Sequence, residues 1–161
     1  MDRIFQKILD GNFSDLTGLT VDASVPVPES LINEIISSTL EGNREISDCR
    51  VTVHEQNRMT VDVKSPRWPW PLHFKLKLFG SVDLSHSPTV RAFLNSNVLL
   101  GRLGSMFKML PPGITVYEDQ VSVDMGAFLN LPDQKQLFEL LKTVEIRTEE
   151  GRLILDIKIE K

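Results

Sequence analysis

The residues of this chain that could act as nucleophiles or bases begin with one cysteine and three histidines. Cys49 lies close to His54 in the sequence, and a thiol beside an imidazole is the arrangement that activates a cysteine nucleophile. Cys49 alternates with Val51 and Val53, however, whereas His54 has the opposite parity in the same run. Because successive side chains of a strand point to opposite faces, the pattern separates the thiol from the imidazole. We therefore expect Cys49 to be a buried structural residue.

Other catalytic and metal-binding patterns are missing from the sequence. A single cysteine excludes an internal disulfide, and the three histidines are too scattered to form a short metal-ligand pair. The carboxylates cluster at predicted turns and helix surfaces, with no pair placed for acid–base chemistry. The sequence contains no phosphate loop, no GxSxG and no HExxH motif. It therefore predicts a protein that is not an enzyme and that needs no cofactor.

The stretch SPRWPWPLHFKLKLFG, residues 65–80, sets both tryptophans between prolines beside basic residues. One interpretation is a proline-rich loop folded back on the core, with both indoles partly buried. The other is a membrane anchor, because indole rings favour the lipid–water boundary and nearby cations favour anionic headgroups. Both interpretations stay open. The candidate ligand or membrane contacts are Trp68, Trp70, Arg67, Lys75, Lys77, Phe74, Leu103 and Phe107.

The charge is unevenly distributed along the chain. Between Val63 and Tyr117 there are seven basic residues and one acid, Asp83, which gives this segment a net charge of +6. Since the whole chain carries −4, the remainder carries −10. If the segment forms one face, that face suits an anionic partner; if it does not, the asymmetry has no such meaning. A nucleic-acid partner is not expected, because the whole chain is acidic and stacking aromatic residues usually lie on strands.

Hydrophobic periodicity predicts the elements that position these residues. Helices are predicted over 4–9, 31–40, 98–110 and 132–144. Strands are predicted over 19–25, 49–53, 59–63, 72–78, 114–116, 121–125, 145–148 and 153–159. Residues 86–97 are ambiguous, with Val90, Ala92 and Leu94 supporting a further strand. Pro26 and Pro28 are expected to end the first strand. The run 72–78 alternates strictly, so Leu72, Phe74, Leu76 and Leu78 should be buried while Lys75 and Lys77 are exposed.

Three of the predicted helices, starting near Leu31, Leu99 and Leu137, are each followed by a predicted hairpin. The fold class is therefore α+β, with a long curved antiparallel sheet packed around apolar helices. A chain of 161 residues fits one domain with a sizeable core. Residues 1–18 form an N-terminal helix and lead-in, and residues 19–161 form the body of sheet and helices.

The segments VPESLINEIISSTLEG, CRVTVHEQNRMTVDVK and LHFKLKLFGSVDL, in that order, resemble the repeating pattern of the TULIP superfamily. The bacterial LmeA-like phospholipid-binding proteins are the nearest comparison, and LGRLGSMFKMLPPGITVYEDQVSVDM is similar to them as well. The resemblance covers roughly residues 19 to 128. It implies a long curved sheet wrapped around a helix, with an apolar groove for lipid chains. It transfers no binding residue by position.

The predicted function is non-enzymatic binding of a lipid or another apolar ligand, with peripheral contact to anionic membrane. The alternative is a protein-interaction module or subunit that docks a partner through the Trp68–Trp70 patch. No apolar run approaches the ~20 residues of a transmembrane helix, and the charged N-terminus does not read as a signal peptide. A cytoplasmic location is therefore expected, or the cell envelope if an export signal has been removed.

Overall fold

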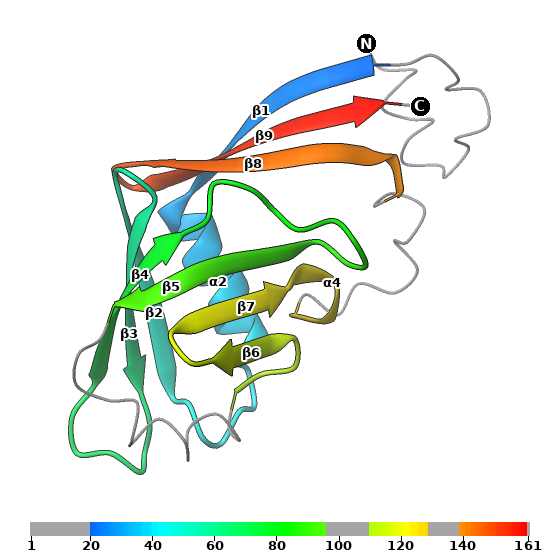
Figure 1. Cartoon of the computed structure of the whole chain (residues 1–161). Helices are drawn as coiled ribbons and strands as arrows, with labels where there is room; N and C mark the ends of the chain where they lie inside the picture. The colour runs from blue at the N-terminus through cyan, green and yellow to red at the C-terminus, as the bar shows by residue number, and fades with distance from the viewer. Residues whose placement is uncertain (1–19, 96–109, 129–138, 161) are drawn as a thin grey trace.

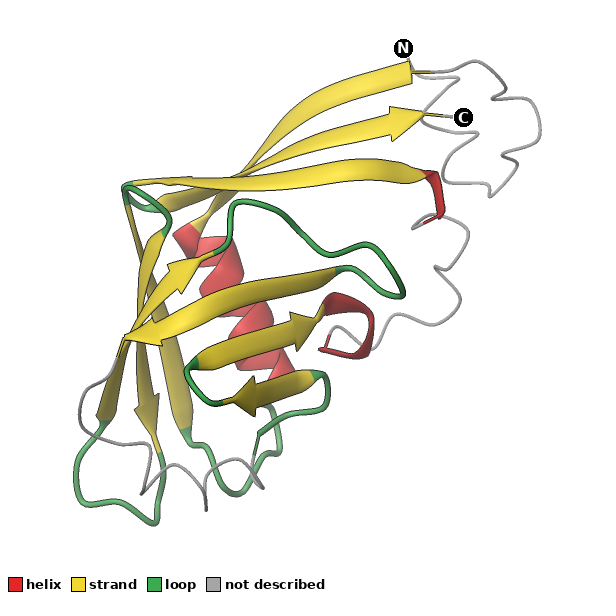
Figure 2. Ribbon diagram, in the orientation of Figure 1, coloured by secondary structure: helices red, strands yellow, loops and turns green. Residues whose placement is uncertain are grey.

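The structure of the protein is a computed structural model that describes residues 20–95, 110–128 and 139–160. The described part consists mainly of antiparallel strands with two helices, so the predicted α+β class is confirmed (Figure 1). The strands form two sheets, where the sequence predicted one long curved sheet. Figure 2 shows the smaller sheet running along the top of the molecule and the larger sheet below it.

The larger sheet has six strands in the order β2-β3-β4-β5-β7-β6. Each neighbouring pair is antiparallel, and β2 and β6 form the two edges. The bounds of its strands are β2 Asp48–His54, β3 Arg58–Lys64, β4 Leu72–Leu78, β5 Thr89–Asn95, β6 Ile114–Tyr117 and β7 Gln120–Asp124. The short helix α4, Met125–Phe128, follows β7 directly.

The register of the six-stranded sheet places its apolar residues in continuous rows on one face, here called the inner face. Val53 pairs with Met59, Met59 with Leu76, and Leu76 with Leu94. The row beginning at Val51 and Val61 continues in the same way into Phe74. The opposite, outer face carries the polar partners of these positions. The predicted alternation of β4 is confirmed, since Phe74 and Leu78 are buried, Leu72 and Leu76 are half-buried, and Lys75 and Lys77 are exposed.

The smaller sheet has three antiparallel strands in the order β1-β9-β8. Their bounds are β1 Thr20–Pro28, β8 Leu141–Glu149 and β9 Arg152–Glu160. β1 continues through Pro26 to Pro28, so the prediction that Pro26 ends it is wrong. Proline lacks an N–H group to donate, but β1 is an edge strand, where one side of the backbone needs no partner.

Helix α2, Glu29–Thr39, follows β1 directly, with Pro28 as an extended N-cap residue. Pro28 fixes the backbone just before the first turn, and Glu29 adds an acid where the helix dipole favours negative charge. Ile32 and Ile36 pack against the core of the larger sheet. Gly42 has a φ of 80° in the turn beyond the helix, a conformation that glycine adopts without strain.

The two apolar faces meet in one core. Val51, Val53, Met59, Leu78 and Ala92 of the larger sheet cluster with Ile146 of β8, and residues of β9 pack against them. A second cluster, here called the lower cluster, contains Ile46, Val63 and Phe74. Among the described residues, Val53 is the one large side chain buried completely.

Several predicted elements differ from the structure or lie outside its described part. The helix predicted over 132–144 does not reach Val144, because β8 already begins at Leu141. Leu141 and Val144 are three residues apart, which fits a helical stripe, but both lie on β8, where a register shift falls between Leu141 and Thr143. The predicted helix at 4–9 lies outside the described residues, as do 98–109 of the helix predicted over 98–110 and 132–138 of the helix predicted over 132–144. The threefold repeat is therefore observed only for α2 with β2 and β3.

Candidate functional site

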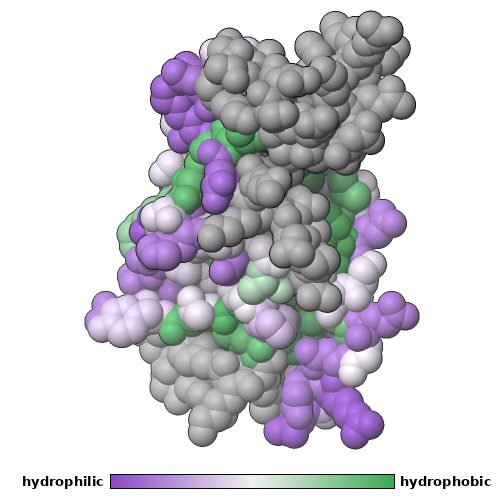
Figure 3. Space-filling model, turned by 90° about the vertical axis from the view of Figure 1, so that its right-hand side faces the viewer, coloured by the Kyte–Doolittle hydropathy of each residue, from purple (hydrophilic) through white to green (hydrophobic). Residues whose placement is uncertain are grey.

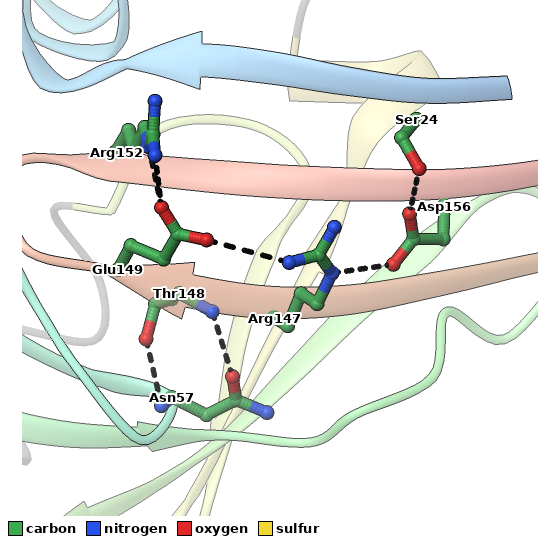
Figure 4. Close-up of polar contacts among 7 residues, drawn as sticks. All are labelled: Ser24, Asn57, Arg147, Thr148, Glu149, Arg152 and Asp156. Carbon is green, nitrogen blue, oxygen red and sulfur yellow. Dashed lines mark hydrogen bonds and ion pairs between the residues drawn. The ribbon is translucent and has the colours of Figure 1, made fainter.

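The two sheets are joined at a polar junction between the β2–β3 turn and the end of β8 (Figure 4). The Asn57 backbone N–H donates to Thr148 Oγ1 at 2.7 Å, and the Thr148 N–H donates to Asn57 Oδ1 at 3.0 Å. The Asn57 amide nitrogen also donates to the Ile146 carbonyl at 3.2 Å. Gln56 and Asn57 both have positive φ in the three-residue turn 55–57, which joins the paired residues His54 and Arg58. The turn that closes the β2–β3 hairpin therefore also fixes the second sheet.

The free edge of β2 is closed by side chains of α2. The Asn33 side chain accepts from the Val51 N–H at 2.7 Å and donates to the Val51 carbonyl at 2.8 Å, as a neighbouring strand would. The Glu29 carboxylate accepts from the Val53 N–H at 2.9 Å. The Val53 carbonyl accepts from the Gly151 N–H at 3.0 Å, so the β8–β9 turn completes the edge. These contacts hold the two sheets together at one end.

Away from this junction the inner face of the larger sheet is less well covered. Its rows continue into β7 and β6 through Val121 and Val123, which pair with Val116 and Ile114. All four side chains are half-buried, and none belongs to the buried clusters formed by the described residues. The inner face is thus apolar across all six strands, and within the described part of the chain its buried residues lie on β2, β3, β4 and the middle of β5. Figure 3 views the molecule from the right-hand side of Figure 1 and shows hydrophobic side chains at the surface among hydrophilic ones.

The structure separates the two tryptophans of the loop 65–71. Trp68 is half-buried and packs against the lower cluster, whereas Trp70 is 65% exposed. Ser65 is buried, accepts from the Trp68 N–H with its carbonyl at 3.1 Å, and anchors the loop. Arg67 pairs with Glu45 at 2.7 Å. The interpretation of a loop folded back on the core therefore holds for Trp68, whereas Trp70 is left at the surface.

The predicted basic segment does not form one uniformly basic side. Lys64 pairs with Asp48 at 3.4 Å and Arg67 with Glu45, and both acids come from outside the segment. Arg91 pairs with Asp83, the one acid within it. Arg102 and Lys108 lie outside the described residues, as do the candidate contacts Leu103 and Phe107. Within the described ranges, Lys75 and Lys77 remain exposed and form no ion pair with a carboxylate.

Phe74, a candidate ligand contact, is a core residue of the lower cluster and is 8% exposed. Lys75 and Lys77 stand on the opposite face of the same strand. The Lys77 ammonium donates to the Gln56 carbonyl of the β2–β3 turn. The six candidate contacts that the structure describes therefore do not form one site: Trp68 and Phe74 pack in or against the lower cluster, while Arg67, Trp70 and the two lysines are exposed.

Cys49 is half-buried, less enclosed than the core position predicted for it. It packs against the lower cluster and borders a shallow hollow where the segment after α2 leads into β2. Burial, followed by the nearby Asp48 and Asp62 carboxylates, raises the pKa of the thiol to about 11. His54 instead contacts Thr60 Oγ1 at 3.1 Å. A neutral thiol without a neighbouring imidazole is not an activated nucleophile.

A serine, a histidine and an aspartate lie together in the segment before β5, which the sequence did not single out. Asp83 Oδ1 accepts from the Ser85 N–H at 3.0 Å and from its hydroxyl at 2.7 Å. These bonds, with a smaller contribution from Arg91, lower the pKa of Asp83. A catalytic triad needs the aspartate on the far nitrogen of the histidine, whereas Asp83 contacts the serine itself. The cluster therefore stabilises a turn.

A ladder of charged residues covers the solvent face of the smaller sheet (Figure 4). Arg147 donates to Asp156 at 2.8 Å and Arg152 donates to Glu149 at 2.7 Å. The bonds from Arg147 and then from Ser24 lower the pKa of Asp156. The described residues contain no group of three potential ligands that could hold a metal ion. They also include no helix with the length and apolar character needed to cross a membrane.

The fold and the site define an α+β protein with two antiparallel sheets that share a core at one end and present apolar faces beyond it. Comparison with protein-family models, curated proteins and solved structures finds no match for this chain.

Proposed function

We propose that the protein binds a lipid or another apolar ligand, without catalysing a reaction, against the inner face of the six-stranded sheet. The observation that carries this proposal is the row of half-buried apolar side chains on β7 and β6. Ile114, Val116, Val121 and Val123 point to the same face as the buried Val51 and Val53 at the far end of the sheet.

The energetics support a ligand at this position. Removing apolar surface from water stabilises by roughly 25 cal/mol per Å², so apolar side chains that stay partly exposed gain by acquiring an apolar partner. The sequence does not compensate for the exposure, because no charged side chain interrupts these rows on the inner face. A flexible acyl chain could lie across neighbouring strands without needing a specific hydrogen bond.

The smaller sheet adds a second apolar surface of the same kind. Beyond the shared core, β9 continues outward with Ile157 and Ile159, which pair with Ala23 and Val21 of β1. All of these except the exposed Ala23 are half-buried. The resemblance to the TULIP superfamily also implies a sheet curved along an apolar groove, and it implies a lipid as the ligand.

Extraction of the purified protein tests this proposal. The chain should be expressed, purified without detergent, denatured in organic solvent and analysed by mass spectrometry for co-purified lipids. We expect a stoichiometric set of lipid species that a polar control protein from the same cells does not carry. A chain free of lipid that also fails to bind a fluorescent fatty acid would contradict the proposal.

The alternative function, docking of a protein partner, is favoured by one observation. Trp70 is 65% exposed in a loop stiffened by prolines and anchored by Ser65 and the Arg67–Glu45 pair. Large aromatic residues held in a fixed orientation are frequent energetic centres of protein interfaces. Under this alternative, Trp70→Ala would abolish capture of a partner, and lipid extraction would find nothing.

A further inference from the structure

A mixed row of cations and aromatic rings crosses the outer face of the six-stranded sheet. Arg58 pairs with Lys77, Lys77 with Phe93, Phe93 with Gln120, and Gln120 with Tyr117. These five residues, here called the outer row, lie on five neighbouring strands. Because a one-residue step reverses the face of a strand, the row stands opposite the apolar rows of the inner face.

The two aromatic side chains of the outer row are exposed to an unusual degree. Tyr117 is 77% exposed and Phe93 is 46% exposed. One strand separates them, which corresponds to a spacing of roughly 10 Å. Phe93 is supported from one side by Phe79, whose ring centre lies 4.7 Å away, and Arg91 lies over Phe79. The Phe93 ring is thus held in place while a large part of it remains in solvent.

Exposed cations stand on the outer face beside the strand that carries Phe93. Arg58, Lys75 and Lys77 are exposed, and Lys75 pairs across the sheet with Thr60 and Asn95 rather than with an acid. Acids also lie nearby: Asp62 stands on the same face and contacts His73, and Glu118 and Asp119 form the turn beyond Tyr117. The cations therefore lie toward β3 and β4, and the rings toward β5 and β6.

We propose that the outer row is a docking surface for an anionic lipid membrane. Lysine and arginine next to a membrane are drawn to acidic headgroups, and tyrosine and other aromatic rings settle at the boundary between headgroups and acyl chains. Charge complementarity selects an anionic surface. This inference rests on the proposed function in one respect. A protein that binds lipid has a reason to dock on a lipid membrane, and the proposed function therefore favours a membrane as the partner in place of an acidic protein.

The position of β6 connects the two faces. β6 is an edge strand of the sheet, with Ile114 and Val116 on the inner face and Tyr117 on the outer face. A membrane in contact with Tyr117 would lie beside the edge that borders the half-buried inner rows. A lipid could then exchange between the membrane and the inner face around β6 without crossing the packed core.

Sedimentation with vesicles tests the proposal, using phosphatidylcholine alone or mixed with phosphatidylserine. We expect binding only to the mixed vesicles and weaker binding at high salt, because salt screens exposed charges. Lys77→Glu should weaken binding about fivefold or more, given what one cation contributes near such a surface. Tyr117→Ala should weaken it by a smaller factor. The controls are Arg44→Glu, an exposed charge reversal outside the sheet, and Leu31→Ala, an exposed apolar truncation on α2.

Three outcomes would overturn the docking surface: no binding of the unaltered chain to mixed vesicles, equal losses in the variants and controls, or binding to an oligonucleotide or an acidic peptide in place of vesicles. This test is independent of the test of the proposed function, because lipid extraction measures only the ligand bound at the inner face. Lys77→Glu should carry as much co-purified lipid as the unaltered chain. If extraction finds no lipid while Lys77→Glu still selectively loses vesicle binding, the docking surface stands and the ligand site fails.

Discussion

The two ends of the six-stranded sheet have the same alternating sequence pattern but different packing. At the β2–β3 end, α2, the β8–β9 hairpin and the loop 65–71 all cover the inner face, and Val53 is completely buried. At the β7–β6 end the inner valines and isoleucine are half-buried. The contrast shows that alternation determines which way a side chain points, whereas burial depends on which other elements reach it.

The first prediction measures this difference directly. Phe74→Ala should lower the free energy of unfolding by about 3–5 kcal/mol, because it opens a cavity among Ile46 and Val63. Val123→Ala, at the other end of the same face, should cost about 1 kcal/mol or less, because its side chain is only half-buried. Urea unfolding of both variants provides the measurement. Equal losses would mean that the two ends are packed alike.

The second prediction concerns the edge of β2 at the packed end. Asn33→Ala should cost about 1–3 kcal/mol, because it removes both partners of the Val51 backbone groups. Glu34→Ala, an exposed neighbour on α2, serves as the control and should change stability little. Hydrogen exchange at the Val51 amide should also accelerate in Asn33→Ala. Unchanged exchange would show that Asn33 does not close the edge.

The third prediction separates the two tryptophans. Trp68→Ala should destabilise the fold by about 1–3 kcal/mol, since it removes a half-buried ring from the lower cluster. Trp70→Ala should leave stability nearly unchanged, because the ring is 65% exposed. In the unaltered chain, Trp68 should emit fluorescence at a shorter wavelength than Trp70. Each single variant leaves one tryptophan, so its spectrum gives the emission of the tryptophan that remains. The reverse order of stability losses would contradict the structure of this loop.

The fourth and smallest effect is at Cys49. A thiol with its pKa raised to about 11 is almost wholly neutral near pH 7, so a thiol reagent should label the native chain far more slowly than the unfolded chain. The pKa rises on folding from 9.0, so the thiol's contribution to stability is complete below pH 9 and is lost as the pH rises toward 11. Rapid native labelling at neutral pH would contradict this environment.

Much of the fold was predictable because local periodicity determines it. The alternating runs of β4, of the β2–β3 hairpin and of β9 all lie where the sequence predicted strands. The stripe from Leu31 to Leu40 likewise predicted α2. The way the two sheets join was not predictable, because it depends on Asn57 and Thr148, two ordinary polar residues far apart in the sequence.

The candidate site was predicted only in part, since net charge along a segment says nothing of the partners that folding brings to it. Glu45 reaches Arg67 from the loop after α2, and Asp48 reaches Lys64 across a strand pair. The outer row was missed because its members come from five strands, each contributing one residue. A signal was present in Lys77 and Phe93, which have the opposite parity to the apolar residues of their strands, but their pairing depends on the register.

The most direct test of the ligand site compares two adjacent residues of β7. Val123 lies on the inner face and Ser122 on the outer face of the same strand. Both Val123→Asp and Ser122→Asp should be titrated with an environment-sensitive fluorescent fatty acid, after circular dichroism confirms that each is folded. We predict that Val123→Asp weakens fatty-acid binding at least tenfold, because a tenfold change corresponds to about 1.4 kcal/mol and burying a charge under an apolar ligand costs more than that. Ser122→Asp should bind as the unaltered chain does. Equal binding by both variants would contradict an apolar ligand site on the inner face.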